Sequence, residues 1–181
     1  MSHDIIMAGF GGQGIMVMGQ LLAYAGMIEY QHVSFIPSYG PEMRGGTANC
    51  SVIVTDEAVG SPIVTEPNFV VAMNLPSLDK FESLIQPGGI LMINSSLIQK
   101  KATRSDITVY TIPANELAQE LGNPKVANMV VLGAIVAASE AVKSESVLQA
   151  FAKMFAKKPK LIEINKLALQ KGADYIKDQQ Q

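Results

Sequence analysis

The sequence predicts an α/β fold in which helices cover both faces of a mostly parallel β-sheet. Short apolar runs of strand type alternate along the chain with longer stretches of helical periodicity, which is the pattern of such sheets. The apolar run 5–8 closes on glycines and leads directly into a helix. Of the 181 residues, 48% are hydrophobic and 17% charged, so the chain can bury one sizeable core. We therefore expect a single domain over residues 1–181.

Six short runs, either continuously apolar or alternating, are the expected strands. They cover residues 5–8, 32–36, 47–54, 69–73, 90–93 and 108–112. The run 47–54 follows its predecessor without an intervening helix, whereas a parallel crossover needs about a dozen residues or more. We therefore expect part of the sheet to be antiparallel.

The expected helices connect these strands and make up the C-terminal segment. They cover residues 14–30, 76–85, 114–121, 126–142 and 144–156, and a last helix begins at residue 160. The C-terminal helices, residues 126–178, should pack on the sheet, and the polar tail "KDQQQ" should fray. Gly19, Ala23 and Gly26 give the first helix small surfaces, which indicates close packing on that side.

The charge balance argues against nucleic acid as the main partner. The net charge is −2 and the isoelectric point is near 5.7, whereas nucleic-acid binding needs a basic face that displaces counterions. Lysines gather in one place, at Lys153, Lys157, Lys158 and Lys160. We interpret this cluster as a solvated helix end, with an anion contact as the alternative.

The sequence indicates a cytoplasmic protein without a membrane span or a metal centre. Its start lacks the basic segment and cleavage site of a signal peptide. The apolar run 126–138 is interrupted by Asn128 and is shorter than the roughly 20 residues of a span. A single cysteine, Cys50, excludes an intrachain disulfide and a Cys-only iron–sulfur site. Cys50 lies in an expected strand and should be a small buried residue, and neither His3 nor His32 has an evident catalytic companion.

The stretch "GFGGQG", residues 9–14, has the spacing G-x-G-x-x-G between a strand and a helix. This arrangement places free backbone N–H groups and a helix N-terminus at the carboxyl edge of the sheet, where anions are stabilised. Glycine permits positive φ and close approach of a ligand. The stretch predicts a contact with a phosphate, a carboxylate or a protein backbone, and a tight turn that binds nothing is the alternative.

The surroundings of this glycine loop depart from those of a dinucleotide site. A nicotinamide dinucleotide needs an acidic residue at the end of the second strand, where it bonds the ribose hydroxyls. Here that strand runs into Pro37, Ser38 and Tyr39, while Glu29 falls on the preceding helix. No Gly-Lys-Ser/Thr follows, so a P-loop is excluded. We expect a Rossmann-like fold without a true dinucleotide site.

A second special loop, "SYGPEMRGG", follows the second expected strand. Pro41 stiffens it, and its glycines permit unusual backbone angles. Arg44 can clamp a phosphate or carboxylate in bidentate fashion, and Glu42 can neutralise Arg44 or face a partner. Because the carboxyl ends of parallel strands meet at one edge, we expect both loops to lie on the same edge of the sheet.

Four stretches together resemble the γ subunit of the 2-oxoacid:ferredoxin (or other acceptor) oxidoreductases. They are "GFGGQG" (9–14), "SYGPEMRGGTANC" (38–50), "TDEAVGSP" (55–62) and "NMVVLGA" (128–134). The resemblance covers essentially the whole chain, and the second stretch is most similar to complexes of the 2-oxoglutarate type.

The resemblance implies a multi-subunit enzyme that oxidatively decarboxylates a 2-oxoacid, 2-oxoglutarate above all, and forms an acyl-coenzyme A. Thiamine diphosphate, Mg²⁺ and iron–sulfur clusters would sit on partner subunits, namely α, β and a ferredoxin-like δ. Ferredoxin or flavodoxin would accept the electrons. This chain would contribute no catalytic residue and would be inert alone. In agreement, it lacks a Gly-Asp-Gly thiamine signature and a Cys-x-x-Cys motif.

The resemblance also implies that both loops face a cleft shared with the catalytic subunits and help to dock coenzyme A. The residues so implicated are Gly9, Gly11, Gly12, Gln13, Gly14, Ser38, Tyr39, Gly40, Pro41, Glu42, Arg44, Gly45, Gly46 and, from the late helix, Asn128. Two alternatives remain open from the residues alone. One is a free-standing nucleotide- or dinucleotide-binding module, and the other is a scaffold whose glycine loops only pack against another protein.

Overall fold

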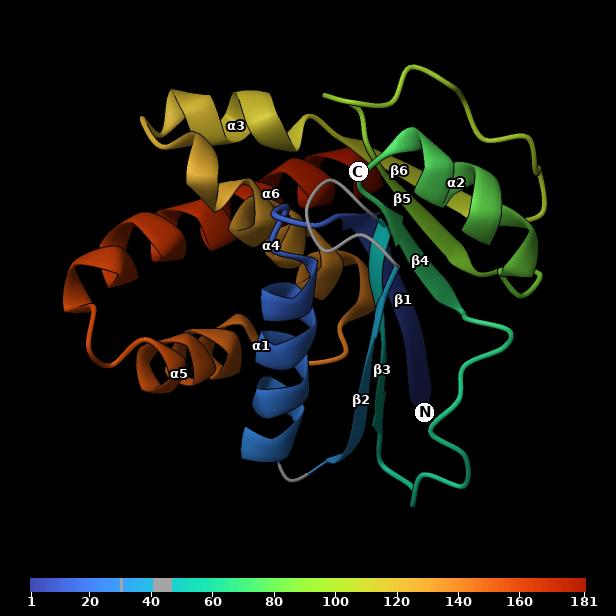
Figure 1. The fold of residues 1–181 in the computed structure, drawn as a ribbon, viewed down its shortest axis with the longest axis horizontal. Helices are drawn as coiled ribbons and strands as arrows, with labels where there is room; N and C mark the ends of the chain where they lie inside the picture. Colours follow the sequence, from blue (N-terminus) through green and yellow to red (C-terminus); the bar gives the residue numbers. More distant parts are fainter. Residues whose placement is uncertain (30, 41–46) are drawn as a thin grey trace.

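The computed structural model describes residues 1–29, 31–40 and 47–181, which form one six-stranded sheet with helices around it (Figure 1). The strand order across the sheet is β2-β3-β1-β4-β5-β6. The strands are β1 (Ser2–Phe10), β2 (His32–Tyr39), β3 (Thr47–Thr55), β4 (Phe69–Ala72), β5 (Ile90–Asn94) and β6 (Thr108–Ile112). Each of them overlaps one of the runs expected from the sequence.

The sheet is mostly parallel, as the sequence predicts. Strands β1, β4, β5 and β6 pair in parallel with one another. Only β3 runs the other way, antiparallel to both β1 and β2. The short connection between β2 and β3 explains this reversal, since it leaves no room for a crossover helix.

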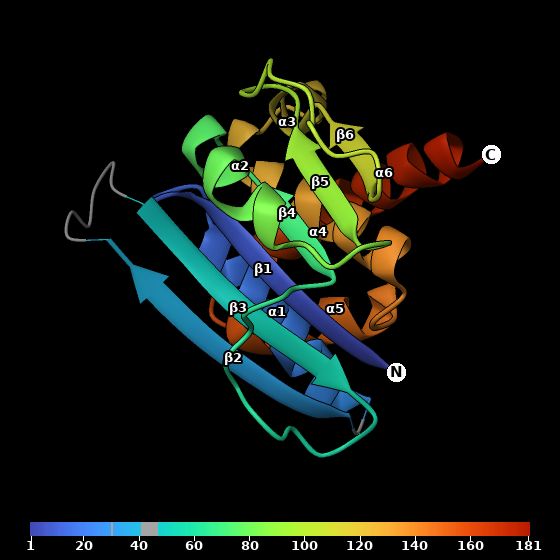
Figure 2. The ribbon, with the colours of Figure 1, turned by 90° about the vertical axis from the view of Figure 1, so that its right-hand side faces the viewer.

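The helices lie on both faces of the sheet. They are α1 (Ile15–Ile28), α2 (Leu75–Phe81), α3 (Ala114–Glu120), α4 (Ala127–Ser139), α5 (Ser144–Met154) and α6 (Ile162–Gln180). Short 3₁₀ turns (Glu82–Leu84, Pro124–Val126 and Pro159–Leu161) adjoin α2, α4 and α6. Figures 1 and 2 show α2 on one face and α1, α4, α5 and α6 on the other.

Several of the expected helix ends differ from the structure by a few residues, and two differences in the C-terminal segment have an evident local cause. The helix expected over 126–142 stops at Ser139, because Glu140 takes a left-handed conformation with φ of 53°. The tail that was expected to fray is helical in the structure: α6 continues to Gln180, and the Gln179 side chain donates a hydrogen bond to the Thr111 carbonyl (2.9 Å). A tertiary contact with β6 thus holds a polar segment that sequence composition alone marks as loose.

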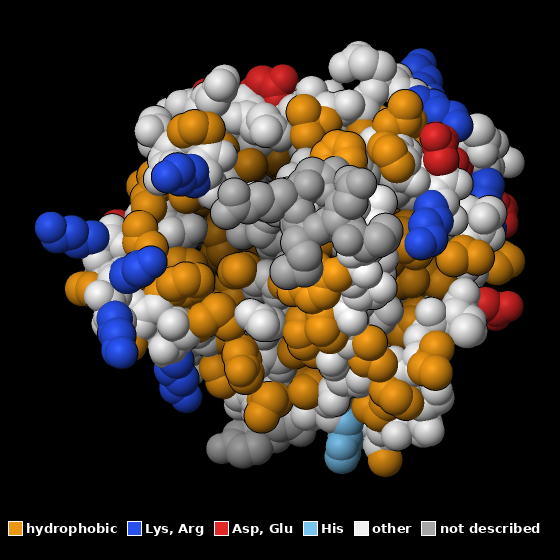
Figure 3. Space-filling model, viewed as in Figure 1, with side chains coloured by type: hydrophobic (Ala, Val, Ile, Leu, Met, Phe, Trp, Pro, Cys, Tyr) orange, Lys and Arg blue, Asp and Glu red, His pale blue; other side chains and the backbone are white. Residues whose placement is uncertain are grey.

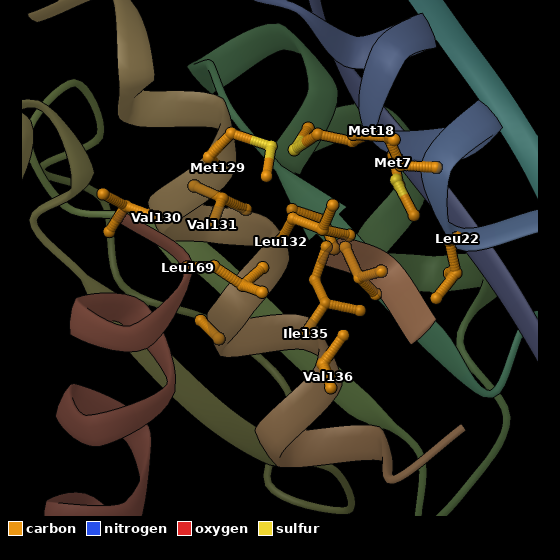
Figure 4. Close-up of a cluster of buried hydrophobic side chains, with 14 of the residues drawn as sticks. Met7, Met18, Leu22, Met129, Val130, Val131, Leu132, Ile135, Val136 and Leu169 are labelled. Carbon is orange, nitrogen blue, oxygen red and sulfur yellow. The ribbon is translucent and has the colours of Figure 1, made fainter. Parts of the chain in front are cut away.

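Helix α4 is the centre of the larger hydrophobic core. Its side chains are buried on every side, which is the property of a helix enclosed by other elements. Met129 of α4 meets Met7 of β1 and Met18 of α1 in this core (Figure 4). A smaller core on the opposite face joins α2, through Leu78 and Phe81, to β1, β4 and β5. Both faces of the sheet are therefore occupied by side chains of the same chain.

The connections from β1 and from β4 lead to opposite sides of the sheet, so the boundary between these two strands is a topological switch point. From β1 the chain proceeds through α1 to β2 on one side, and from β4 through α2 to β5 on the other side. Helices α1 and α2 belong to the two opposite cores, so the connections diverge there. In open α/β sheets ligands bind in the crevice at the carboxyl ends of the strands at such a switch point.

Candidate functional site

The glycine loop forms one wall of this crevice. Gly12 and Gly14 have φ values of 93° and 75°, in the left-handed region that favours glycine. Gly14 is the N-cap residue of α1, and no side chain caps this helix. The first N–H groups of a helix have no partner within the helix, so here they are available to a ligand. The loop therefore presents a free helix N-terminus at the switch point.

Gln13 ties the glycine loop to the neighbouring strand. Its side-chain oxygen accepts a hydrogen bond from the Phe10 amide (2.6 Å), and its Nε2 donates to the Met73 carbonyl (3.4 Å). Gly9 makes room for this contact, since a Cβ there would stand 2.3 Å from Gln13 Oε1 and 2.8 Å from Met73 Cβ. Gln13, expected as a ligand contact, thus also joins the ends of β1 and β4.

A cleft of about 210 Å³ opens beside the loop. Its walls come from the glycine loop, the end of β4, the start of α3, the 3₁₀ turn Pro124–Val126 and the start of α4. The lining residues are Gly12, Gln13, Gly14, Met73, Asn115, Pro124, Lys125, Ala127 and Asn128. Segments far apart in the sequence therefore meet at one edge of the sheet.

The cleft contains four of the residues expected from the sequence. Gly12, Gln13, Gly14 and Asn128 line it together. Asn128 lies directly against the glycine loop, because a Cβ on Gly14 would stand 2.4 Å from Asn128 Nδ2. Gly9 and Gly11 belong to the same loop but do not line the cleft.

Sequence reasoning missed Met73, Asn115 and Lys125, which complete the walls. Asn115 comes three residues after β6, at the same edge of the sheet as the glycine loop. Lys125 follows Asn123, whose side chain accepts a hydrogen bond from the Lys125 amide (3.0 Å) and so orders the turn before α4. The sequence does show polar residues after the strand β6 and before the helix α4. Nothing in the sequence, however, indicates that Asn115 and Lys125 come together beside the glycine loop.

The electrostatics of the cleft favour an anion. Helices α1 and α4 begin beside it, and the N-terminal end of a helix carries a partial positive charge. Among the described lining residues, Lys125 is the charged one, and its side chain is exposed. The amide groups of Asn115 and Asn128 add neutral donors and acceptors.

The second predicted loop starts and ends at the same sheet edge as the first. Tyr39 pairs with Ala48, and the Gly40 amide donates to the Thr47 carbonyl (2.8 Å). Phe10, which precedes the glycine loop, pairs with Thr47 as well. Because β3 separates the two strands, β2 lies about 10 Å from β1 by strand spacing, and Ser38, Tyr39 and Gly40 do not line the cleft. Pro41, Glu42, Arg44, Gly45 and Gly46 lie outside the described residues.

The groups that most often carry catalysis lie away from the cleft or are buried. His3 and His32 stand at the amino ends of β1 and β2, the opposite edge of the sheet. Cys50 is fully buried, and burial raises the pKa of its thiol to about 12, so it is neutral at physiological pH. Within the described ranges, His, Cys, Asp and Glu form no group of three or more placed to hold a metal ion.

These features place the chain in a class, the open α/β folds with a ligand crevice at the switch point of the sheet. Comparison with known proteins then identifies its family. The sequence profile described as pyruvate ferredoxin/flavodoxin oxidoreductase matches residues 4–175. The chain belongs to this family, and the resemblance to γ subunits of oxoacid oxidoreductases is confirmed by the relatives below.

Two relatives illustrate the range of similarity. The chain is 40% identical to the ketoisovalerate oxidoreductase subunit VorA of Methanothermobacter thermautotrophicus, over 94% of this chain and 36% of VorA. It is 34% identical to the 2-oxoglutarate synthase subunit KorC of Methanocaldococcus jannaschii, over 98% of this chain and 96% of KorC. The chain thus spans about a third of VorA and nearly all of KorC.

Solved structures share the fold. The γ subunit of the keto/oxoacid ferredoxin oxidoreductase from Geobacter sulfurreducens superposes with a TM-score of 0.82 at 27% identity, over 97% of this chain and 99% of that one. The 2-oxoglutarate:ferredoxin oxidoreductase of Magnetococcus marinus, solved with 2-oxoglutarate, coenzyme A and succinyl-CoA, gives a TM-score of 0.91 over 98% of this chain and 31% of that one. At 23% identity this second likeness concerns the fold alone. In the described part of the chain, no helix is long and apolar enough to span a bilayer.

Proposed function

We propose that this chain is the γ subunit of a 2-oxoacid:ferredoxin oxidoreductase and that it docks coenzyme A without contributing a catalytic residue. The observation that carries the proposal is the cleft at the switch point, where two helix N-termini and Lys125 converge beside a glycine loop. Such an environment stabilises phosphate groups. Membership in the oxidoreductase family supplies the enzyme to which this cleft would belong.

Coenzyme A would occupy the cleft only in part. About 210 Å³ is less than the roughly 300–1,000 Å³ of a complete small-molecule pocket. A phosphate-bearing portion can sit against the α1 N-terminus and Lys125, and the remainder would extend toward the other subunits. When bound, coenzyme A supplies the thiol that accepts the acyl group. The residues of this chain would hold its anionic part, and the left-handed Gly12 would let it approach the backbone closely.

The remaining cofactors belong, in this proposal, to the other subunits. Thiamine diphosphate with Mg²⁺ and the iron–sulfur clusters would be held by the α, β and ferredoxin-like δ subunits, with ferredoxin or flavodoxin as the electron acceptor. Two observations support a chain without thiol redox or histidine acid–base chemistry at the cleft. Its single cysteine is buried and protonated, and both histidines lie at the sheet edge opposite the cleft.

The proposed substrate is 2-oxoglutarate. KorC, which is named as a 2-oxoglutarate synthase subunit, matches the chain over nearly its whole length. A branched-chain 2-oxoacid is the second candidate, since VorA, named as a ketoisovalerate oxidoreductase subunit, has the higher identity. The described residues of the cleft do not discriminate between these acids, because the oxoacid would react on another subunit.

Sheet topology argues against the alternative of a free-standing dinucleotide-binding module. In a dinucleotide fold the second strand lies beside the first and brings its terminal acid to the ribose. Here the antiparallel β3 takes that position, and β2 lies one strand further out. The residues at the end of β2, Ser38 and Tyr39, carry no carboxylate.

The test is calorimetric titration of the purified chain, alone and assembled with its cognate subunits, with coenzyme A and with NAD⁺. We expect coenzyme A to bind, more tightly in the complex, and NAD⁺ not to bind. Coenzyme A-dependent reduction of the acceptor by 2-oxoglutarate should require the chain, and replacing the substrate by 2-oxoisovalerate decides between the two acids. A complex that turns over equally well without this chain would refute the proposal.

A further inference from the structure

Helix α1 has the composition of a buried helix but lies on the outside of the molecule. None of its 14 residues is charged, and Gln20 is its most polar side chain. Its inner side packs against β2 and β3, where Gly19 admits Phe35 and Gly26 admits Val33. A helix that is apolar all round is normally enclosed on all sides. The outer side of α1 is nevertheless open, with Tyr24 49% and Met27 56% exposed.

This open side borders a groove between α1 and α5. The groove has a volume of about 700 Å³, larger than the cleft at the switch point. Gln20, Tyr24, Met27 and Ile28 line it from α1, and Ala150, Lys153 and Met154 from α5. Five of these seven lining residues are hydrophobic, and we call them the apolar floor of the groove; Gln20 and Lys153 are polar. Two of the five are methionines, which adapt their shape to a partner. We call it the α1–α5 groove; Figure 3 shows hydrophobic side chains across this part of the surface.

The α5 rim of the α1–α5 groove carries a basic side chain, Lys153, which lines the groove. Three more lysines, Lys157, Lys158 and Lys160, follow the lining residue Met154 within six residues, in the exposed segment between α5 and α6. Figure 3 shows several Lys or Arg side chains projecting at this side of the molecule. Among the described residues none of these four lysines lies within 4.0 Å of a carboxylate, and no acidic side chain lines the groove.

We propose that the α1–α5 groove is the docking site for an amphipathic helix with acidic residues along its edge, contributed by another subunit of the oxidoreductase. The inference rests on the proposed function for the existence of that subunit. A helix laid into a groove between two helices buries its apolar face there, and its flanks meet the rims. Acidic flanks complement the lysines of this rim, which speeds and orients association.

The same charge pattern disfavours a second copy of this chain as the occupant. A second copy would bring its own lysine rim to the contact, and like charges facing each other oppose binding. The relatives provide an independent reason to expect further polypeptide around this fold. The matching region is only 36% of VorA, so in that protein the fold is covalently joined to a longer chain.

The α1–α5 groove is separate from the cleft that would hold coenzyme A. The cleft lies at the N-terminus of α1, whereas Met27 lies at the other end, about 20 Å further along the helix axis. A helix in the groove therefore leaves the cleft open. Docking of the subunit and binding of coenzyme A can accordingly be disrupted one at a time.

The test uses the complete oxidoreductase, purified after co-expression of its subunits. A water-soluble carbodiimide joins lysines to carboxylates in direct contact, and mass spectrometry locates the links. We expect links from Lys153, Lys157, Lys158 or Lys160 to a helix of another subunit. Links from these lysines to a second copy of the chain, or an intact complex in which they form none, would overturn the proposal.

Two matched double variants give a second, independent readout. Lys153→Glu with Lys157→Glu reverses a lysine that lines the groove and one that follows it closely, and Lys100→Glu with Lys101→Glu reverses two exposed lysines, neither of which lines the groove. We expect the first to weaken subunit association roughly tenfold or more, the effect of losing important interface contacts, and the second to leave it unchanged. Equal association of both variants would overturn the proposal.

Tyr24→Ala tests the apolar floor in the same assay and should likewise weaken association. Circular dichroism of each isolated variant verifies that it is folded. Titration with coenzyme A should give the affinity of the unaltered chain in every variant, because these positions lie outside the cleft. Weakened association with unchanged coenzyme A affinity would show that the groove binds a subunit independently of the coenzyme A site. Failure of the unaltered chain to join any oxidoreductase subunit would refute both.

Discussion

Gly172 of α6 lies so close to Val130 of α4 that a Cβ on Gly172 would stand 1.7 Å from the Val130 carbonyl oxygen. An equally close approach occurs one turn further along α4, where a Cβ on Gly133 would stand 1.9 Å from the Leu169 carbonyl oxygen of α6. The two helices therefore touch backbone to backbone. Since α4 is the centre of the larger core, this contact anchors the whole C-terminal segment.

Gly172→Ala is expected to destabilise the protein by about 2–3 kcal/mol, the upper range for an overpacked contact. The methyl group would meet backbone atoms, which cannot rotate away as a side chain can. Urea unfolding followed by circular dichroism measures the change. Gly60→Ala is the matched control, because nothing lies within 4 Å of a Cβ there and its φ lies outside the left-handed region. Equal stability of the two variants would show that α6 can move away from α4 at little cost.

A second prediction concerns the glycine loop. Gly12→Ala and Gly14→Ala both place a side chain at positive φ, at a cost of roughly 1–2 kcal/mol each. Gly14→Ala additionally drives a methyl group into Asn128, whose Nδ2 and Cβ would stand 2.4 and 3.0 Å away. Gly14→Ala should therefore be the more destabilising of the two.

A double-mutant cycle isolates this contact. In the Gly14→Ala background, Asn128→Ala removes the clashing amide and should restore part of the lost stability. In the Gly12→Ala background, where no atom lies within 4 Å of the new methyl group, Asn128→Ala should restore nothing. Additive effects of Gly14→Ala and Asn128→Ala would mean that the two residues do not touch.

The cleft itself is tested at Lys125, which sequence reasoning did not single out. If Lys125 contacts a phosphate of coenzyme A, Lys125→Ala should weaken binding roughly tenfold, equivalent to about 1.4 kcal/mol. The variant should also lessen the dependence of affinity on salt, because one ionic contact is lost. Titration calorimetry at two salt concentrations measures both. Lys166→Ala, an exposed lysine of α6 outside the cleft, is the control, and equal affinity of the two variants would remove Lys125 from the site.

Cys50 should be unreactive in the folded protein. Its side chain is fully buried, and burial raises the pKa of the thiol from its usual value of 9.0 to about 12. A thiol reagent at pH 8 should therefore modify the native protein only as fast as it unfolds, and the denatured protein at once. Rapid stoichiometric labelling of the native chain would contradict this placement of Cys50.

The same shift makes stability depend on alkaline pH. Above pH 9 the unfolded thiol loses its proton while the folded thiol keeps it, so unfolding becomes more favourable. The contribution of Cys50 to stability is intact below pH 9 and decreases as the pH rises from 9 to about 12. Cys50→Ala should lack this part of the pH dependence in urea unfolding curves.

The fold could be predicted from the sequence because its determinants are local. Apolar runs such as 69–73 and 90–93 favour buried strands because they are short and lie next to turn residues, and the glycines of "GFGGQG" favour a tight strand-to-helix turn. The antiparallel β3 followed from the length of one connection. Each of these inferences needs only neighbouring residues.

The site could be predicted only in part, because its walls are assembled by tertiary structure. Asn115 and Lys125 are ordinary polar residues of helix starts, and only the sheet brings them to the glycine loop. Gln13 was expected to face a ligand and lines the cleft, but that its hydrogen bonds also join β1 to β4 could not be read from the sequence. Gly133 and Gly172 lie within helices, and the sequence does not indicate which backbone packs against a glycine in a helix.

The last prediction concerns Glu82, a buried carboxylate that holds the long connection between β5 and β6. It is 6% exposed, and its Oε1 accepts hydrogen bonds from the Thr103 amide (2.6 Å), the Thr103 hydroxyl (3.1 Å) and the Arg104 amide (3.1 Å). Three donors on one charged oxygen form a strong local anchor. Glu82→Ala leaves these donors unpaired, at a cost of about 1–3 kcal/mol.

Loss of this anchor should be visible before global unfolding. Amide hydrogen exchange at Thr103 and Arg104 should accelerate by one to two orders of magnitude in Glu82→Ala, which corresponds to about 1.4–2.8 kcal/mol. Exchange in β1 and β4, which Glu82 does not contact, should follow only the change in global stability. Glu163→Ala, which removes an exposed carboxylate of α6 away from this connection, is the control. If Glu82→Ala and Glu163→Ala exchange alike at Thr103, these hydrogen bonds do not hold the connection in place.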